Sequence, residues 1–208
     1  MLKKEKPVIT YILLAVNIFY FLFLEAIGNS QSTDFMLRYG AAYTPYILEK
    51  GEYWRLVTSM FMHFGIEHIA NNMLILYLLG SHLEKTIGKW KYGFVYFVAG
   101  IGANVISMLV HMKDAQAVVS AGASGAVFAL AGGVLAASIK NRGRLEELTT
   151  RQLAIMIVAM LWFGFSATGV DNVAHVSGAA IGFLLTMILF RPKYERYAVS
   201  YTHLRAHE

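Results

Sequence analysis

Four polar side chains that could carry out chemistry lie near the starts of long apolar stretches: His68, Asn72, Ser124 and His175. A serine hydroxyl becomes a nucleophile when a base lies within hydrogen-bond reach and donors face the developing oxyanion. His68 and Asn72 are four residues apart, so a helix presents both on one face. Ser124 lies beside glycines at an expected helix N-terminus, where a carbonyl carbon can approach and free amides add positive potential. Together the four supply a nucleophile, a base and two donors.

Each of these residues also has a purely structural interpretation. His68 and Asn72 could form interhelical hydrogen bonds, and Ser124 could be one of the small residues that line close helix contacts in membranes. His175 could cap its helix or bond a carbonyl, with the glycines after it forming a packing stripe. For any one residue alone the structural interpretation is the better one, and only the combination favours catalysis.

The composition indicates a membrane protein. Of 208 residues, 57% are hydrophobic and 15% charged, and the mean hydropathy is +0.50, which excludes a soluble globular domain. The absence of cysteine excludes disulfides, a thiolate nucleophile, iron–sulfur ligation and cysteine-bearing zinc sites. The net charge of +5 does not predict nucleic-acid binding, because in a membrane protein the placement of basic residues matters more than their sum.

Long apolar stretches predict an all-α, polytopic membrane protein with a bundle of six transmembrane helices. The first stretch lacks a small-residue cleavage site, so it is predicted to be a retained span rather than a signal peptide. A first outer loop of about forty residues contains Tyr43, Tyr46, Tyr53 and Trp54 and is expected to lie in the membrane interface. The predicted spans are 8–27, 69–83, 92–112, 123–139, 152–168 and 173–190.

Basic residues gather in the loops of one side, which predicts that both termini are cytoplasmic. Spans two, four and six then all run inward from the outer face. The four polar residues therefore lie at one depth, roughly 5–10 Å below the outer boundary. The basic residues of the inner side are Lys3, Lys4, Lys6, Lys85, Lys89, Lys91, Lys140, Arg142, Arg144, Arg151, Arg191, Lys193 and Arg196, whereas Lys113 is the one in the second outer loop.

Two further segments complete the interpretation. Asp171 lies in the loop four residues before His175 and is expected to face water, so a Ser–His dyad is predicted rather than a triad. Residues 200–208 do not continue any apolar period and are interpreted as a tail of non-native origin. The functional domain is therefore predicted to be 1–199.

At this point the sequence resembles the rhomboid family of intramembrane serine proteases, over about 53–190. Four motifs occur in the order and spans that the family has. They are the nucleophile motif G-x-S-G at 122–125, the base motif A-H-x-x-G-x-x-x-G at 174–182, the second-span pattern H-x(4)-H-x(3)-N at 63–72, and the pair Trp54-Arg55 in the first loop.

The resemblance implies hydrolysis of peptide bonds in or near transmembrane helices of other membrane proteins. It assigns Ser124 as the nucleophile, His175 as the base, and His68 and Asn72 to the oxyanion hole. His63, Gly122 and Gly125 belong to the same motifs and are expected to support the site. It requires no metal or other cofactor, and its partners would be single-span or multi-span membrane proteins and the lipid bilayer, not nucleic acid.

One position departs from many members of that family. Phe128 stands where they have a tyrosine, one helical turn after Ser124, and its ring is expected to pack on the imidazole of His175 without the hydroxyl. The minimal six-span form is typical of bacteria and implies a plasma-membrane location. The sequence leaves the substrate, the cleavage site and the oligomeric state open.

Two other functions compete with proteolysis. A catalytically inactive relative would bind membrane proteins without cutting them, but Ser124 and His175 are both retained. A small transporter should spread polar groups through the full depth of the membrane. Here the inner halves of spans four and six are apolar, which argues against a transport pathway.

Overall fold

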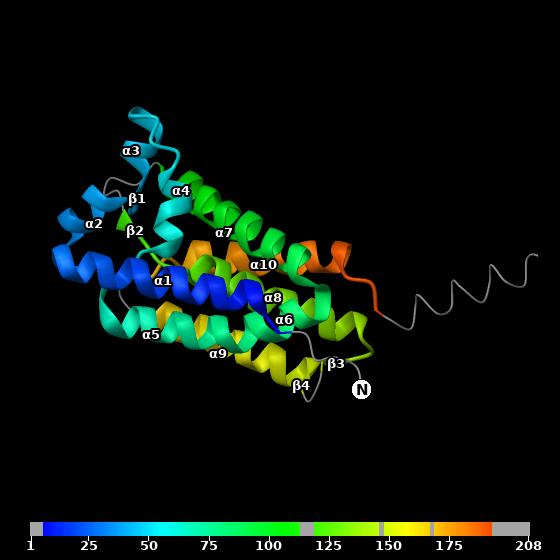
Figure 1. Ribbon diagram of the computed structural model, residues 1–208. Coiled ribbons are helices and arrows are strands. Elements are labelled where there is room, and N and C mark those ends of the chain that lie inside the picture. Colours follow the sequence, from blue (N-terminus) through cyan, green and yellow to red (C-terminus); the bar gives the residue numbers. More distant parts are fainter. Residues whose placement is uncertain (1–5, 113–118, 146–147, 167–168, 193–208) are drawn as a thin grey trace, which may run out of the picture.

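The computed structural model describes residues 6–112, 119–145, 148–166 and 169–192, and these form a bundle of helices (Figure 1). The predictions for Lys3, Lys4, Lys113, Lys193, Arg196 and the tail 200–208 concern residues outside the described ranges. The long helical segments are α1 (Val8–Ile27), α5 (Gly65–Ile75) continued by η2 (Leu76–Gly80) and α6 (Ser81–Ile87), α7 (Lys89–His111), α8 (Ser124–Lys140), α9 (Thr150–Ser166) and α10 (Asn172–Leu189).

The second predicted span is longer than the apolar stretch at 69–83. The chain is helical from Gly65 to Ile87, through the π-helical turn η2. An apolar stretch underestimates the length of this helix because polar residues at its two ends, such as Glu67 and Glu84, are helical too. Helix α1 has the bounds of the first predicted span, and the bounds of the other long helices differ from the predicted spans by a few residues at most.

A folded segment connects α1 to α5. It contains α2 (Thr33–Tyr39), β1 (Ala42–Tyr43), α3 (Thr44–Glu49), α4 (Arg55–Thr58) and η1 (Ser59–Phe61). The buried Arg55 donates to the carbonyls of Leu37 and Ala41 at 2.7 and 2.9 Å and pairs with Glu52. Strand β1 pairs antiparallel with β2 (Val119–Ser120), just before α8, while β3 (Arg144–Leu145) pairs with β4 (Leu148–Thr149).

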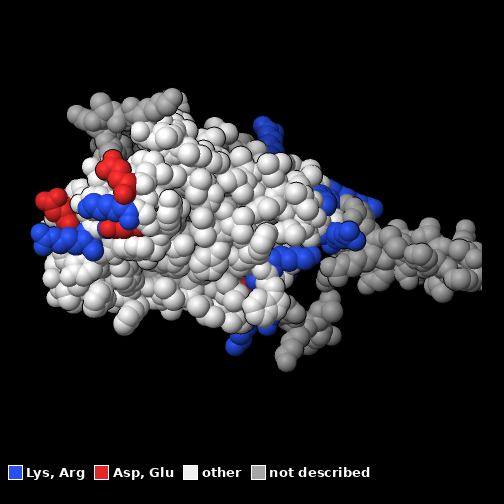
Figure 2. Space-filling model, turned by 90° about the horizontal axis from the view of Figure 1, so that it is seen from above, with Lys and Arg blue, Asp and Glu red and all other residues white. Residues whose placement is uncertain are grey.

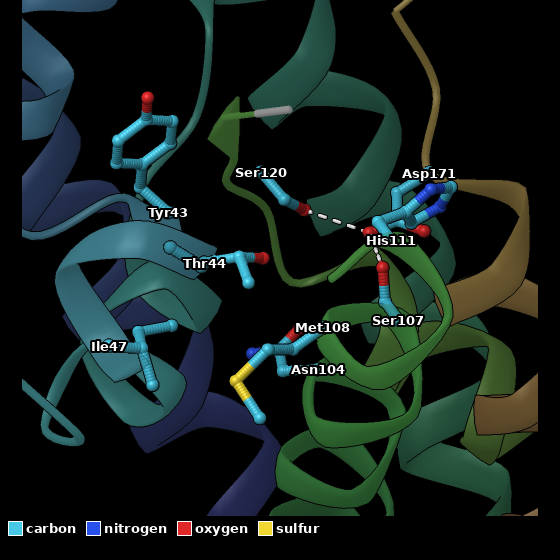
Figure 3. A pocket seen from close by; sticks show the side chains of 10 residues that line it. Tyr43, Thr44, Ile47, Asn104, Ser107, Met108, His111, Ser120 and Asp171 are labelled. Carbon is cyan, nitrogen blue, oxygen red and sulfur yellow. Dashed lines mark hydrogen bonds between the residues drawn. The ribbon is translucent and has the colours of Figure 1, made fainter. Parts of the chain in front are cut away.

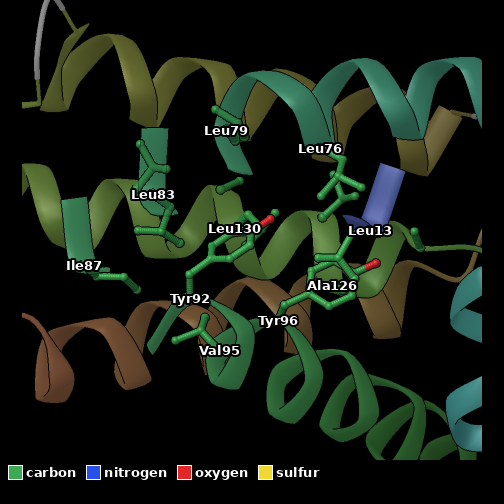
Figure 4. Close-up of a cluster of buried hydrophobic side chains, with 14 of the residues drawn as sticks. Leu13, Leu76, Leu79, Leu83, Ile87, Tyr92, Val95, Tyr96, Ala126 and Leu130 are labelled. Carbon is green, nitrogen blue, oxygen red and sulfur yellow. The ribbon is translucent and has the colours of Figure 1, made fainter. Parts of the chain in front are cut away.

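Helix α8 is the centre of the bundle. Most of its side chains are buried, and it packs against α7, α9, α10 and the α5–α6 segment. Large side chains such as Leu76, Leu83 and Tyr96 fill the space around Ala126 and Leu130 of α8 (Figure 4). The contact with α10 is a backbone contact, since a Cβ at Gly182 would lie 2.0 Å from the carbonyl oxygen of Ala129. Small residues thus let these two helices approach closely.

The outer surface of the bundle is apolar. Among the described residues, α1, α7 and α10 are long and apolar enough to cross a membrane, and α8 and α9 are shorter apolar helices. Large side chains that would be costly in water, such as Phe19, Trp162 and Ile188, are 70–74% exposed. A surface of this kind is typical of helices that face lipid. The count of six spans and the interfacial position of the first loop remain predictions.

The two ends of the bundle differ in charge. Lys and Arg predominate at the end where α6 meets α7, whereas acidic and basic residues mix at the end formed by α2, α3 and α4 (Figure 2). At the basic end, Lys140 donates to the carbonyls of Met187 and Phe190 at 2.8 and 2.5 Å and so caps α10.

Glu84 is buried and fastens α6 to the start of α1. Its carboxylate accepts from the amides of Ile9 and Thr10 at 2.8 and 2.7 Å and from the Thr10 hydroxyl at 2.8 Å. We expect Glu84→Ala to lower the free energy of unfolding by about 2–4 kcal/mol, because buried amides lose a charged acceptor. Glu84→Gln keeps one acceptor oxygen and should lose less. Thermal unfolding in detergent measures both, and an alanine variant that melts like the wild type would contradict this role.

Candidate functional site

Ser124 is the first residue of α8 and is partly exposed. The two residues before it are held from outside the helix, since the Gly122 amide donates to the Ser59 carbonyl at 2.9 Å and the Ala123 amide to Nε2 of His63 at 3.4 Å. The first helical bond runs from Val127 to Ala123. The amides of the first turn, beginning with Ser124, therefore have no partner within the helix and carry the positive end of its dipole.

His63 supports the loop that carries Ser124. The ring is fully buried between η1 and α5, and burial, with the neighbouring His68 as a lesser cause, lowers the pKa of His63 to about 3. The ring is therefore neutral at physiological pH, and its Nε2 can accept the Ala123 amide. His63 thus holds the residue directly before Ser124.

His68 lies in the first turn of α5, and its ring lies beside Gly122 in the loop that leads into Ser124. Its Nδ1 accepts the Phe64 amide at 3.4 Å, so the ring is neutral and Nε2 carries the hydrogen. A Cβ at Gly122 would lie 2.9 Å from this Nε2 and 3.6 Å from the Ser124 hydroxyl oxygen. The space over Gly122, whose φ is +142°, is therefore flanked by a donor and a hydroxyl, and only glycine leaves it open.

Asn72 follows His68 by one helical turn on α5 and is buried. The spacing places both residues on the same side of the helix.

His175 is buried in the first turn of α10 and stacks on Phe128 of α8. The ring centroids are 4.2 Å apart and the planes are inclined by 20°, which is the packing expected from the position of Phe128 one turn after Ser124. Helix α10 is pressed against α8 at this point, since a Cβ at Gly178 would lie 2.2 Å from the carbonyl oxygen of Gly125. Gly125 thus contributes a bare backbone surface, and His175 is held against the first turns of α8.

The expectation that Asp171 faces water is wrong. Asp171 is partly buried and caps α10, because its Oδ1 accepts the Ala174 amide at 2.9 Å. Its Oδ2 accepts the hydroxyls of Ser107 at 2.6 Å and Ser120 at 3.2 Å. The sequence gives no clear signal of these bonds, because Ser107 and Ser120 lie 64 and 51 residues away along the chain.

The start of α8 carries the Ser124 hydroxyl and free helix amides with the His68 ring beside them, and His175 packs on the same helix one turn further on. Such a set can transfer an acyl group to serine and stabilise the oxyanion formed on the way. In the described part of the chain, no group of three His, Asp or Glu side chains could hold a metal ion.

Comparison with known proteins gives a consistent result. A family model described as Rhomboid domain matches residues 50–192, which include all of the predicted site residues. The chain is 34% identical to Rhomboid protease GluP of Bacillus subtilis (strain 168) over 188 residues, 90% of this chain and 36% of that protein. It is 37% identical to RHOMBOID-like protein 5 of Arabidopsis thaliana over 151 residues, 71% of this chain and 48% of that protein.

A third relative is closer in size. The chain is 28% identical to Putative rhomboid protease YdcA of Bacillus subtilis (strain 168) over 192 residues, which is 92% of each protein. By contrast, it spans 36% of the length of GluP and 48% of that of RHOMBOID-like protein 5.

Proposed function

Because the chain belongs to the rhomboid family, we propose that it is an intramembrane serine endopeptidase with a Ser124–His175 dyad. The observation that carries this proposal is the arrangement around the start of α8. There the partly exposed Ser124 is the first residue of the helix, His175 stacks on the ring of Phe128 one turn further on, and His68 flanks the space beside the serine.

The proposed roles follow from the chemistry of each group. Ser124 attacks the scissile carbonyl, and His175 takes the hydroxyl proton and later passes it to the leaving amine. Nε2–H of His68, the side-chain amide of Asn72 and the free amides at the start of α8 hold the oxyanion. Phe128 fixes the plane of the imidazole by stacking, and Gly122 keeps open the space that the oxyanion enters.

We place the site near the outer face of a bacterial plasma membrane, in a six-span protein with both termini in the cytoplasm. The predominance of Lys and Arg at the other end of the bundle supports this orientation. Water then reaches Ser124 from outside, and the substrates are single-span or multi-span membrane proteins. A carbonyl in an intact helix is already hydrogen-bonded, so segments with Gly, Pro or polar residues near the outer boundary should be cut most readily.

The test is cleavage of a single-span substrate by the purified protein in liposomes, together with labelling by a fluorophosphonate. Cleavage near the outer end of the substrate helix and labelling at Ser124 are expected. Labelling without cleavage of any of a set of helix-destabilised substrates would contradict the endopeptidase. Binding of the substrate with neither reaction would favour the inactive, client-binding relative instead.

Removal of one oxyanion donor should weaken turnover without abolishing it. We expect His68→Ala and Asn72→Ala each to lower kcat by about 10–1,000-fold, because the backbone amides and the other donor remain. Initial rates of cleavage at saturating substrate measure the effect. Ser177→Ala is the control, since this hydroxyl bonds only backbone carbonyls of its own helix in the described structure. Unchanged rates in both variants would make this face of α5 structural.

A further inference from the structure

The carboxylate of Asp171 joins three parts of the molecule. It caps α10 through the Ala174 amide, reaches α7 through the Ser107 hydroxyl, and reaches β2 through the Ser120 hydroxyl. The three side chains meet at the edge of a small pocket between α7, β1 and the start of α10 (Figure 3). Hydrogen bonds to a charged acceptor are stronger than those between neutral groups, so this is a firm junction.

Ser120 and Asp171 each lie the same number of residues before a member of the proposed dyad. Ser120 lies four residues before Ser124, and Asp171 lies four residues before His175. The hydrogen bond between them therefore joins the two segments that lead directly into the proposed nucleophile and base. Further along the chain from this junction, α8 and α10 are in contact where Phe128 stacks on His175.

The third bond anchors the junction to a rigid element. Ser107 is buried on α7, one of the long helices packed against both α8 and α10. The Ser107 bond is the shortest of the three at 2.6 Å. Through Asp171, the start of α10 and strand β2 are therefore both bonded to α7, which limits their movement relative to each other.

We propose that Asp171 is a positioning residue that sets the distance between Ser124 and His175 by holding β2 and the start of α10 together. This inference rests on the proposed function of the dyad. Asp171 acts through the backbone of both segments. It differs from the third member of a catalytic triad, which bonds the base itself.

The test separates the cap from the junction. Asp171→Ser keeps a good N-cap for α10 but is too short to bridge to Ser107 and Ser120. Ser120→Ala leaves the cap and the Ser107 bond intact and removes only the link to the nucleophile loop. The matched control is Ser138→Ala on α8, whose hydroxyl bonds Leu135 and Thr150 near the other end of the helix.

The readouts are the rate of fluorophosphonate labelling of Ser124 and kcat and KM for a single-span substrate, each well below the melting temperature of the variant. We expect Asp171→Ser and Ser120→Ala each to slow labelling and to lower kcat by about 10–100-fold with KM unchanged. The double variant should be no slower than the slower single variant, because both changes break the same link. Ser138→Ala should label at the wild-type rate.

A purely structural role would lower the melting temperature and leave the rates of the folded protein unchanged, and that result would overturn the inference. Labelling at the wild-type rate in Ser120→Ala alone would also overturn it, even if Asp171→Ser failed to fold. A wild-type protein that neither labels nor cuts would instead remove the proposed function on which the inference rests. Normal labelling of the wild type, together with wild-type rates in the variants, would overturn this inference alone and leave the proposed function standing.

Discussion

Replacement of Ser124 by alanine is expected to abolish both cleavage and fluorophosphonate labelling, while the protein stays folded and inserted. The hydroxyl is the proposed nucleophile, and alanine leaves no group at this position that could attack the scissile carbonyl. The change removes one oxygen atom from a partly exposed residue at the start of α8, so the packing of the helix should be unaffected. Turnover and labelling should fall to background, and thermal unfolding in detergent should match the wild type.

The partner variant His175→Ala should lose labelling as well as cleavage, because a serine hydroxyl is a weak nucleophile without its base. It should also melt at a lower temperature, since the ring packs against Phe128. Ser177→Ala again serves as the control on the same helix. Turnover by Ser124→Ala at the wild-type rate would remove the serine mechanism, and undiminished labelling of His175→Ala would remove this histidine from the dyad.

The candidate site was largely predictable because of where its residues lie. Polar side chains are costly inside a membrane, so His68, Asn72, Ser124 and His175 stand out against the apolar stretches around them. The stacking of Phe128 on His175 was predictable as well, because helical spacing places a ring one turn beyond the serine. These inferences use only spacing within one helix and the shared depth of several helices.

Asp171 was not predictable in the same way. Its two serine partners are 64 and 51 residues away in the sequence, and no spacing rule connects them. Ser107 lies in an apolar helix, where single serines are common, and Ser120 lies in a strand of two residues, so neither hydroxyl indicates a carboxylate partner. The pairing of β1 with β2 was missed for a related reason, because strands of two residues are too short to show an alternating pattern.

The contacts of the first loop could not be predicted from its aromatic residues. Its aromatic residues predict an interfacial segment, which stays a prediction, and the structure leaves Tyr53 and Trp54 exposed. The buried Arg55, however, binds carbonyls that lie 14 and 18 residues earlier in the chain. The loop also supplies Ser59 and His63, which hold the two amides before Ser124. The segment therefore forms one wall of the site as well as a connection between helices.

Gly178→Ala is expected to impair stability and catalysis together. The added Cβ would lie 2.2 Å from the carbonyl oxygen of Gly125, so α10 must move away from α8 at the level of the site. Overpacking of this kind costs about 1–3 kcal/mol in cores. Because Ser124 and His175 lie on the two separated helices, a displacement of about 1 Å should also lower kcat by about 100-fold. Thermal unfolding and initial cleavage rates on the same samples measure the two effects.

Gly93→Ala on α7 is the matched control for this substitution. Among the described residues, a Cβ there would meet only the side chain of Ile9, at 3.9 Å, which is ordinary van der Waals contact. Alanine favours a helix by about 1 kcal/mol over glycine, so this variant should be as stable as the wild type or more stable, and equally active. If Gly178→Ala behaved like Gly93→Ala, the close approach of α8 and α10 would not be what holds His175 against the start of α8. The stacking on Phe128 and the Asp171 junction would then have to suffice.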